Sequence, residues 1–304
     1  MELFRVETLA RRCVGTTRPI QAITRIEVVE PEGRGGMKIS LLPSAACPTA
    51  SIPRDAGTWE GVVSRQYLTS FLINDTIAVD AGSLGFQPLE VQDRVRHVLI
   101  SHIHMDHVAS LPIFLENVYR GASQAEAVAV HAEEWTWRNL RDDLFNDRVW
   151  PDFVRLSTPQ NAFMRLAHLE TDRPFELDGV RIRPVRVDHV VPTVGFVVED
   201  DCDAVVIVSD TGPTEAIYEV ARATPNLRAV FLEACFPNAM EGLAKVSKHL
   251  TPQMFGVEAA KLPPGVPVLA VHIKSRFQTQ VLKELAALER PEIQPARMGW
   301  TYTW

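Results

Sequence analysis

The chain has 304 residues, of which 46% are hydrophobic, so it is long enough to bury a large core. Its formal net charge of −7 argues against a protein that wraps extended nucleic acid, because neutralising many phosphates requires an excess of Lys and Arg. The four cysteines show no Cys-x-x-Cys spacing, no apolar run is long enough to span a membrane, and no secretory signal is evident. We therefore expect a cytoplasmic protein without a membrane partner.

The first residues differ in character from the rest of the chain. Residues 26–29 have the composition of a strand, but a Pro- and Gly-rich stretch up to Gly36 interrupts the chain before the apolar run that starts at Met37. Because that run is typical of a first strand, we predict an extension over residues 1–36, which is dispensable, and a single domain over residues 37–304.

Residues 74–79 are predicted to form a strand, and Asp80 follows this strand directly. A carboxylate at this place could accept the ring N–H of a ligand histidine and so fix the orientation of the ring. The alternative is an Asp that only begins a tight turn before Gly82.

The most informative segment is HIHMDH, from His102 to His107, which holds three histidines and one carboxylate. Histidines crowded together repel one another when protonated, whereas a divalent metal needs several neutral imidazoles around one point. The apolar run 96–101 before the segment predicts a buried strand, and the spacing over 111–119 predicts a helix after it. The segment therefore occupies a loop at the end of a strand, where α/β proteins build their sites.

The segment from His102 to His107 alone supplies too few ligands for two metals. Three later residues could supply the missing ligands. Each is a metal-ligating residue type that follows a predicted strand: His189 after 180–187, Asp210 after 204–209, and His272 after 267–271. A lone His or Asp after a strand is more often a turn residue. The three together, behind the first segment, indicate a metal centre.

This set of residues resembles the ligand pattern of the metallo-β-lactamase fold superfamily. The resemblance implies an α/β fold, namely a four-layer αββα sandwich of two mixed β-sheets flanked by helices. It also implies two Zn²⁺ ions, for which Mn²⁺ or Fe²⁺ could substitute. By position, His102, His104 and His189 would hold one metal, Asp106, His107 and His272 would hold the other, and Asp210 would bridge the pair.

Two further segments, NDRVWPDF at 146–153 and KHLTP at 248–252, resemble the class II cyclic-nucleotide phosphodiesterases. Met105 departs from that pattern, where Leu is expected, and so does Cys235, where Ser is more usual; neither is a candidate ligand. The resemblance implies hydrolysis of 3′,5′-cyclic AMP or cyclic GMP to the 5′-nucleotide by a hydroxide that bridges the two metals.

The leaving ribose oxygen needs a proton, and Asp106 or His249 could supply it. His249 and Lys274 could also contact the substrate, although His249 could instead be an exposed residue before the next helix and Lys274 a solvated one. Trp150 and Phe153 could stack on a base, but we expect them to pack in the interior.

Three glutamates could be mistaken for catalytic carboxylates. We interpret Glu116 and Glu133 as solvated helix positions, and Glu233, which ends an apolar run, as a candidate partner of a site residue. The helical spacing over 133–146 predicts a short amphipathic helix over the site.

Three alternatives stay open. A ribonuclease Z-like nuclease would share the dinuclear centre and a histidine like His249, but the acidic chain favours a small cyclic nucleotide over a large nucleic acid. A hydrolase of lactones or of other esters is the second alternative. The third is a metal-holding scaffold without catalysis, which would be expected to have lost a ligand. The sequence is compatible with a homodimer but does not require one.

Overall fold

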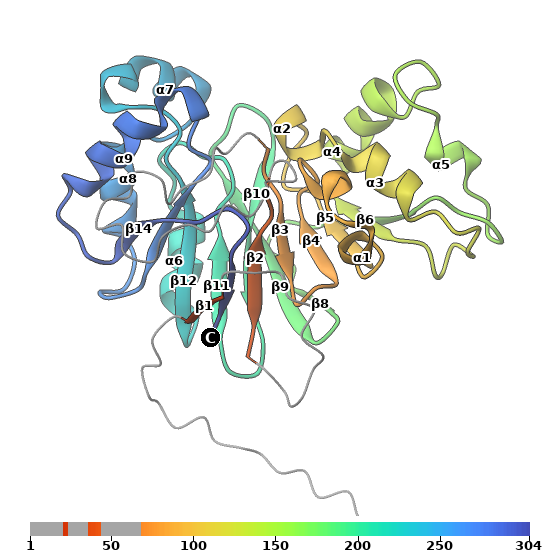
Figure 1. Cartoon of the computed structure of the whole chain (residues 1–304), viewed down its shortest axis with the longest axis horizontal. Helices are drawn as coiled ribbons and strands as arrows, with labels where there is room; N and C mark the ends of the chain where they lie inside the picture. Colours follow the sequence, from red (N-terminus) through yellow and green to blue (C-terminus); the bar gives the residue numbers. More distant parts are fainter. Residues whose placement is uncertain (1–20, 24–35, 44–67) are drawn as a thin grey trace, which may run out of the picture.

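The computed structural model describes residues 21–23, 36–43 and 68–304, and two mixed β-sheets packed face to face form its centre (Figure 1). The first sheet has eight strands and the second has seven. One group of helices lies on the outer side of each sheet (Figure 1). The αββα sandwich implied by the resemblance is therefore confirmed.

The first sheet combines an antiparallel part with a parallel part. Its strands are, in spatial order, β1 (Gln21–Ile23), β15 (Thr301–Thr303), β2 (Lys38–Leu41), β3 (Phe71–Ile73), β4 (Ile77–Val79), β5 (His97–Leu99), β6 (Ala129–Ala132) and β7 (Arg165–His168). The strands from β4 to β7 are parallel, so their C-terminal ends lie at one edge of the sheet.

The second sheet is mixed in the same way. Its strands are, in spatial order, β14 (Ile293–Pro295), β13 (Val268–Val271), β12 (Leu227–Glu233), β11 (Ala204–Ile207), β10 (Thr193–Glu199), β9 (Val180–Val187) and β8 (Phe175–Leu177). β11 to β14 are parallel. β9 runs in the same direction, because it is antiparallel to β10, which is antiparallel to β11. The ends of β9, β11, β12 and β13 therefore share one edge.

Three hydrophobic cores fill the three interfaces between the four layers. The helices outside the first sheet are α1 (Leu89–Gln92), α2 (Met105–Val108), α3 (Leu111–Asn117), α4 (Glu134–Asn139) and α5 (Phe153–Leu156). Those outside the second are α6 (Ala216–Ala223), α7 (Glu241–Ser247), α8 (Pro252–Ala259) and α9 (Gln278–Ala286). The middle core joins Phe71 of the first sheet to Phe231 of the second, whose rings meet edge to face at 5.3 Å.

Most of the strands predicted from the sequence are present, and β9 spans residues 180–187 as expected. α4 begins the helix expected over 133–146, and one turn of π-helix over Leu140–Leu144 continues it. The interpretation of Glu133 as a solvated position is wrong. Both of its carboxylate oxygens accept hydrogen bonds from Arg186 of β9, at 2.6 and 2.8 Å, and its side chain is only 12% exposed. Helical spacing could not show this pairing, because Arg186 belongs to the other sheet.

The described residues also bear on the ends of the chain and on its cysteines. β1 pairs with β15, whereas the strand expected at 26–29 and most of the extension lie outside the described residues, so the dispensability of residues 1–36 stays a prediction. Within the described ranges, no helix is long and apolar enough to cross a membrane. Cys202 lies at an exposed position and Cys235 at a buried one.

Candidate metal centre

The candidate ligands lie in loops that leave the shared strand edges of the two sheets. The first segment follows β5 and continues into α2, which carries Asp106 and His107 near the top of the molecule in Figure 1. His189, Asp210 and His272 follow β9, β11 and β13. A hydrogen bond of 3.2 Å from the Val194 N–H to the Ser101 carbonyl joins the two edges. Six of the nine histidines of the chain gather here.

At three residues that follow strands of the two sheets, the backbone adopts a left-handed conformation and changes direction. Asp80 after β4 has φ 61°, Ser209 after β11 has φ 66°, and His272 after β13 has φ 55°. A side chain at such a φ costs about 1–2 kcal/mol, so the surrounding structure must hold each of them in place. For Asp80, its own N–H donates to the Leu99 carbonyl at 2.8 Å.

The first group of ligand atoms belongs to His102, His104, His189 and Asp210, which lie within 4.8 Å of one another. His104 Nδ1 is 3.1 Å from His102 Nε2 and 3.2 Å from His189 Nε2. Burial lowers the pKa of His189 to about 4, so its ring is neutral at pH 7. Converging neutral imidazoles of this kind are what a divalent metal requires.

The second group belongs to Asp106, His107 and His272, again within 4.8 Å. Asp210 lies between the two groups, because its two oxygens face different histidines. Oδ2 is 3.7 Å from His102 Nε2, whereas Oδ1 is 3.3 Å from His107 Nε2 and 3.4 Å from His272 Nε2. Its carboxylate therefore lies where a bridge between two metals would be.

A buried ring nitrogen without a hydrogen-bond partner supports the fit of these residues to two divalent metals. His107 is fully buried, and its Nε2 has no hydrogen-bond partner in the described part of the chain. Its Nδ1 is held by Asp80 Oδ2 at 2.7 Å, which is the contact expected for Asp80. Imidazole and carboxylate ligands suit Zn²⁺, Mn²⁺ and Fe²⁺. The assignment of these side chains to two metals stays a prediction.

Three groups orient the ligands in ways that the sequence motifs did not reveal. Ser101 donates its N–H and its hydroxyl to Asp80, both at 2.8 Å, and its Oγ lies 3.0 Å from His102 Nδ1. His189 Nδ1 donates to the Lys248 carbonyl at 3.0 Å. A backbone carbonyl leaves no signal in the sequence, and Ser101 could have been found only as the polar residue that precedes the first histidine.

His249 lies beside both groups and pairs with Glu233. His249 Nδ1 is 2.6 Å from Glu233 Oε1, which also accepts the Thr211 N–H at 2.9 Å, and Glu233 Oε2 accepts the Leu250 N–H at 3.1 Å. Burial disfavours the imidazolium, but the Glu233 carboxylate outweighs it and raises the pKa of His249. The alternative of an exposed His249 is therefore wrong, because the side chain is buried, and Thr251 caps α8 instead.

Lys274 contacts the second group rather than lying free in solvent. Its Nζ donates to Asp106 Oδ2 at 3.1 Å, and the side chain is 38% exposed. Burial opposes ionisation of Asp106, but His272, His107 and Lys274 outweigh it and hold the pKa of Asp106 far below its usual range. Asp106 is therefore an anion at neutral pH.

The aromatic residues of the 146–153 segment pack in the interior, as expected. Phe153 is buried and stacks on Phe163, with ring centroids 4.2 Å apart and planes inclined by 4°. Trp150 packs against the same core on the outer side of the first sheet. Neither side chain is positioned to stack on a nucleotide base in this structure.

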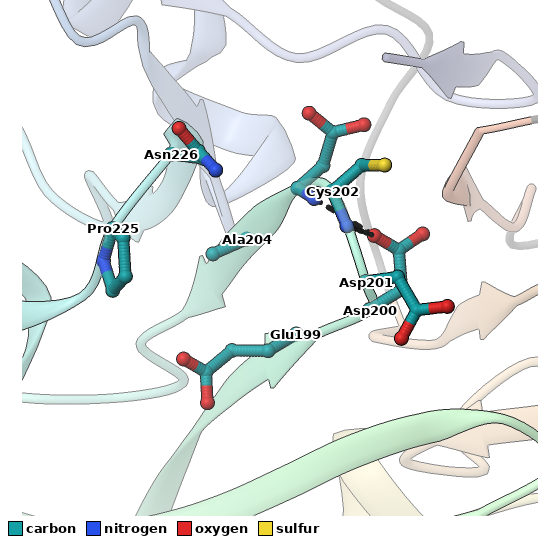
Figure 2. Close-up of a pocket in the computed structure, with 8 residues that line it drawn as sticks. Glu199, Asp200, Asp201, Cys202, Ala204, Pro225 and Asn226 are labelled. Atoms are coloured by element: carbon teal, nitrogen blue, oxygen red, sulfur yellow. Dashed lines mark hydrogen bonds between the residues drawn. The ribbon is translucent and has the colours of Figure 1, made fainter. Parts of the chain in front are cut away.

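A pocket lies at the end of β11 opposite to the candidate metal centre, around the hairpin turn between β10 and β11 (Figure 2). Its lining is acidic, but the carboxylates of Asp200 and Asp203 already have partners. Asp200 accepts the N–H groups of Cys202 and Asp203, both at 2.8 Å, and Asp203 pairs with Arg228. These contacts are those of a stable turn.

Gly82 is required where the loop after β4 meets the metal-binding segment. A Cβ at Gly82 would overlap the Asp106 carbonyl oxygen and lie 2.7 Å from the backbone nitrogen of Thr69. We expect Gly82→Ala to lower the free energy of unfolding by about 3 kcal/mol, because backbone cannot move aside easily, and to lower the metal content of the second group. Thermal or denaturant unfolding and elemental analysis of the purified protein measure both effects.

Gly242 in α7 provides the matched control. A Cβ there would meet nothing within 4 Å, so Gly242→Ala should leave metal content unchanged and raise helix stability by up to about 1 kcal/mol. A Gly82→Ala protein with normal stability and full metal content would contradict the close packing described here.

Residues 72–273 match the family model described as the beta-lactamase superfamily domain. The chain belongs to this superfamily. A curated relative, a ribonuclease Z from Metallosphaera sedula, is 27% identical over 152 residues, and the match covers 47% of this chain and 47% of that protein. The chain thus matches about half the length of this relative.

Two solved structures share the superfamily fold over most of the chain. Unliganded yeast PDE1 gives a TM-score of 0.67 at 17% identity and covers 89% of this chain and 100% of that one. The metallo-β-lactamase fold protein YhfI from Bacillus subtilis gives a TM-score of 0.62 at 15% identity and covers 88% and 99%. At these identities the likeness establishes the fold. The protein is therefore built on the metal-dependent hydrolase fold of the superfamily.

Proposed function

We propose that this protein is a phosphodiesterase that uses two divalent metals, most simply Zn²⁺, to hydrolyse 3′,5′-cyclic nucleotides to 5′-nucleotides. One observation carries the proposal: the Asp210 carboxylate lies between two histidine groups, and the buried Glu233–His249 pair lies beside them. Two metals held there would supply Lewis acidity and a bound water of lowered pKa. The remaining steps belong to the side chains of the chain itself.

The ligand side chains are held in place before any substrate arrives. Asp80 and the Lys248 carbonyl bind the non-ligating ring nitrogens of His107 and His189, so neither imidazole can rotate or change tautomer without losing a hydrogen bond. We expect ligands fixed in this way to hold the phosphorus of a bound diester between the two groups without rearranging during the reaction.

His249 is the better proton donor of the two candidates. The Glu233 carboxylate stabilises its protonated form, whereas Asp106 is held as an anion by His272, His107 and Lys274 and has no proton to give. In the proposed reaction, His249 protonates the ribose 3′-oxygen as its bond to phosphorus breaks. Asp106 acts as a metal ligand only, and Lys274 binds a phosphate oxygen.

The charge near the centre favours a small substrate. The two lysines in its loops are each paired with a carboxylate, Lys248 with Asp188 at 2.7 Å and Lys274 with Asp106 at 3.1 Å. Within the described residues of these loops, little positive charge is left over for a chain of phosphates, whereas a cyclic nucleotide carries a single negative charge. The segments at 146–153 and 248–252, which resemble the class II cyclic-nucleotide phosphodiesterases, support the same substrate class.

A second candidate is a nuclease, and a specific observation favours it. The curated ribonuclease Z is 27% identical over 152 residues, which is closer in sequence than either solved structure. A nuclease would use the same dinuclear centre and the same His249. A cytoplasmic location and a homodimer stay expectations under either function.

A substrate panel separates the candidates. The zinc-loaded protein is given 3′,5′-cyclic AMP, 3′,5′-cyclic GMP, bis(p-nitrophenyl) phosphate, a precursor tRNA and a lactone, and an Asp210→Ala protein purified in parallel controls for contaminating enzymes. We expect 5′-AMP or 5′-GMP to form. Cleavage of bis(p-nitrophenyl) phosphate with neither cyclic nucleotide would overturn the substrate, and cleavage of the tRNA would favour the nuclease. Hydrolysis of the lactone alone would overturn phosphodiester chemistry altogether.

A further inference from the structure

A third group of metal-ligating side chains lies against the metal centre. Cys235 follows β12 closely, and Cys235, His249 and His272 place one ligand atom each within 4.8 Å of one another. All three side chains are buried, and Cys235 is 0% exposed. The backbone holds the cysteine against the His272 loop, since Ala234 N–H donates to the Val271 carbonyl and Lys274 N–H donates to the Cys235 carbonyl.

His272 has a ring nitrogen that the dinuclear centre does not use. Its Nε2 faces Asp106 Oδ2 at 3.1 Å and Asp210 Oδ1 at 3.4 Å. Its Nδ1, on the other side of the ring, is buried and has no hydrogen-bond partner in the described part of the chain. Because buried polar atoms are almost always paired, an unpaired Nδ1 beside a cysteine and a second histidine points to a ligand.

His249 offers a suitable nitrogen as well. Its Nδ1 is engaged by Glu233 Oε1 at 2.6 Å, which leaves Nε2 for a metal and fixes the ring as ligand histidines usually are. Its ring is stacked on that of His272, with centroids 5.6 Å apart and planes inclined by 18°. Two imidazoles and one thiolate form a common donor set for Zn²⁺ and for softer divalent metals.

We propose that Cys235, His249 and His272 form an additional, inhibitory site for one thiophilic divalent metal, such as zinc in excess, cadmium or cobalt. Binding forms one sulfur–metal and two nitrogen–metal bonds, and three protons leave to solvent. The thiol loses its proton because a coordinating thiol is deprotonated. His249 loses the proton on Nε2, and His272 loses the proton on Nδ1, so that its ring bridges the added metal and the dinuclear centre as an imidazolate. Without a metal the thiol is neutral and inert, since burial raises its pKa. The inhibition, but not the binding, rests on the proposed function, because a metal on His249 removes the proton donor.

Cobalt tests the site in the intact holoenzyme. The protein is first loaded with two zinc ions and then titrated with Co²⁺, while near-ultraviolet absorption and hydrolysis of 3′,5′-cyclic AMP are followed. A cobalt ion bound to a thiolate gives a charge-transfer band, whereas cobalt that exchanges into the dinuclear centre meets only nitrogen and oxygen ligands. We expect one further equivalent of cobalt to produce that band and to lower turnover by roughly tenfold or more.

Matched cysteine variants assign the band to its residue. Cys235→Ser should lose both the band and the inhibition and keep its basal turnover, while Cys202→Ser, which alters an exposed thiol at the far hairpin, should keep both. Cys235→Ala serves if the serine variant does not fold. A missing band at saturating cobalt, or a band that persists in a folded Cys235 variant, would overturn the site. If no substrate is hydrolysed, the band still tests the site, so failure of the proposed function is distinguished.

Discussion

Replacing Asp210 by Ala is expected to lower turnover by roughly 10³-fold or more, because losing the proposed metal bridge would remove several kcal/mol of transition-state stabilisation. The reason lies in its two oxygens, of which Oδ2 faces His102 and Oδ1 faces His107 and His272. No other carboxylate among the described candidate ligands contacts both groups. Metal content should fall below two per chain, which elemental analysis of the purified protein measures.

Asp203→Ala is the matched control for that change. Asp203 is also a buried carboxylate and precedes the same strand, but it pairs with Arg228 at the end of the sheet far from the site. Its loss should cost stability while metal content and turnover per folded molecule are retained. Normal turnover in Asp210→Ala with two metals bound would refute the ligand assignment.

Replacing His249 by Ala is expected to lower turnover of 3′,5′-cyclic AMP by about 10²–10⁴-fold while two metals per chain remain bound. A ribose alkoxide is a poor leaving group that needs a proton, whereas p-nitrophenolate leaves without one. Hydrolysis of bis(p-nitrophenyl) phosphate should therefore fall much less in the same variant. Initial rates with the two substrates, compared at equal metal content, measure the difference.

Glu233→Gln checks the same role through pH. Glu233 raises the pKa of His249, so the protonated donor persists to higher pH, and activity is lost as the pH rises through that value. Removing the carboxylate should shift the alkaline limb of the rate profile to lower pH. Equal losses with both substrates in His249→Ala, together with an unmoved alkaline limb in Glu233→Gln, would show that His249 is structural.

The candidate ligands could be predicted because their signals are local. His102 to His107 form one short segment, and His189, Asp210 and His272 each follow an apolar run that the sequence shows directly. The parallel arrangement of the strands then brings the ends of these runs to one edge. The fold followed from the resemblance of this pattern to a known superfamily.

The pairings between distant residues could not be predicted in the same way. Cys235 and His272 belong to separate strand-end loops, and Glu133 precedes α4 whereas Arg186 belongs to β9 of the second sheet. Which side chains meet across a sandwich depends on how the sheets are placed on one another, which periodicity does not encode. The sequence therefore indicated Glu233 as a partner but not that His249 is the residue it holds.

Seven side chains are proposed to hold two metals, with Asp210 between them. Crystals of the zinc-loaded protein, with anomalous diffraction collected on both sides of the zinc edge, test this proposal most directly. We expect two zinc peaks about 3.5–4 Å apart, one on each side of the Asp210 carboxylate. One zinc peak alone, or two peaks that Asp210 does not join, would contradict it.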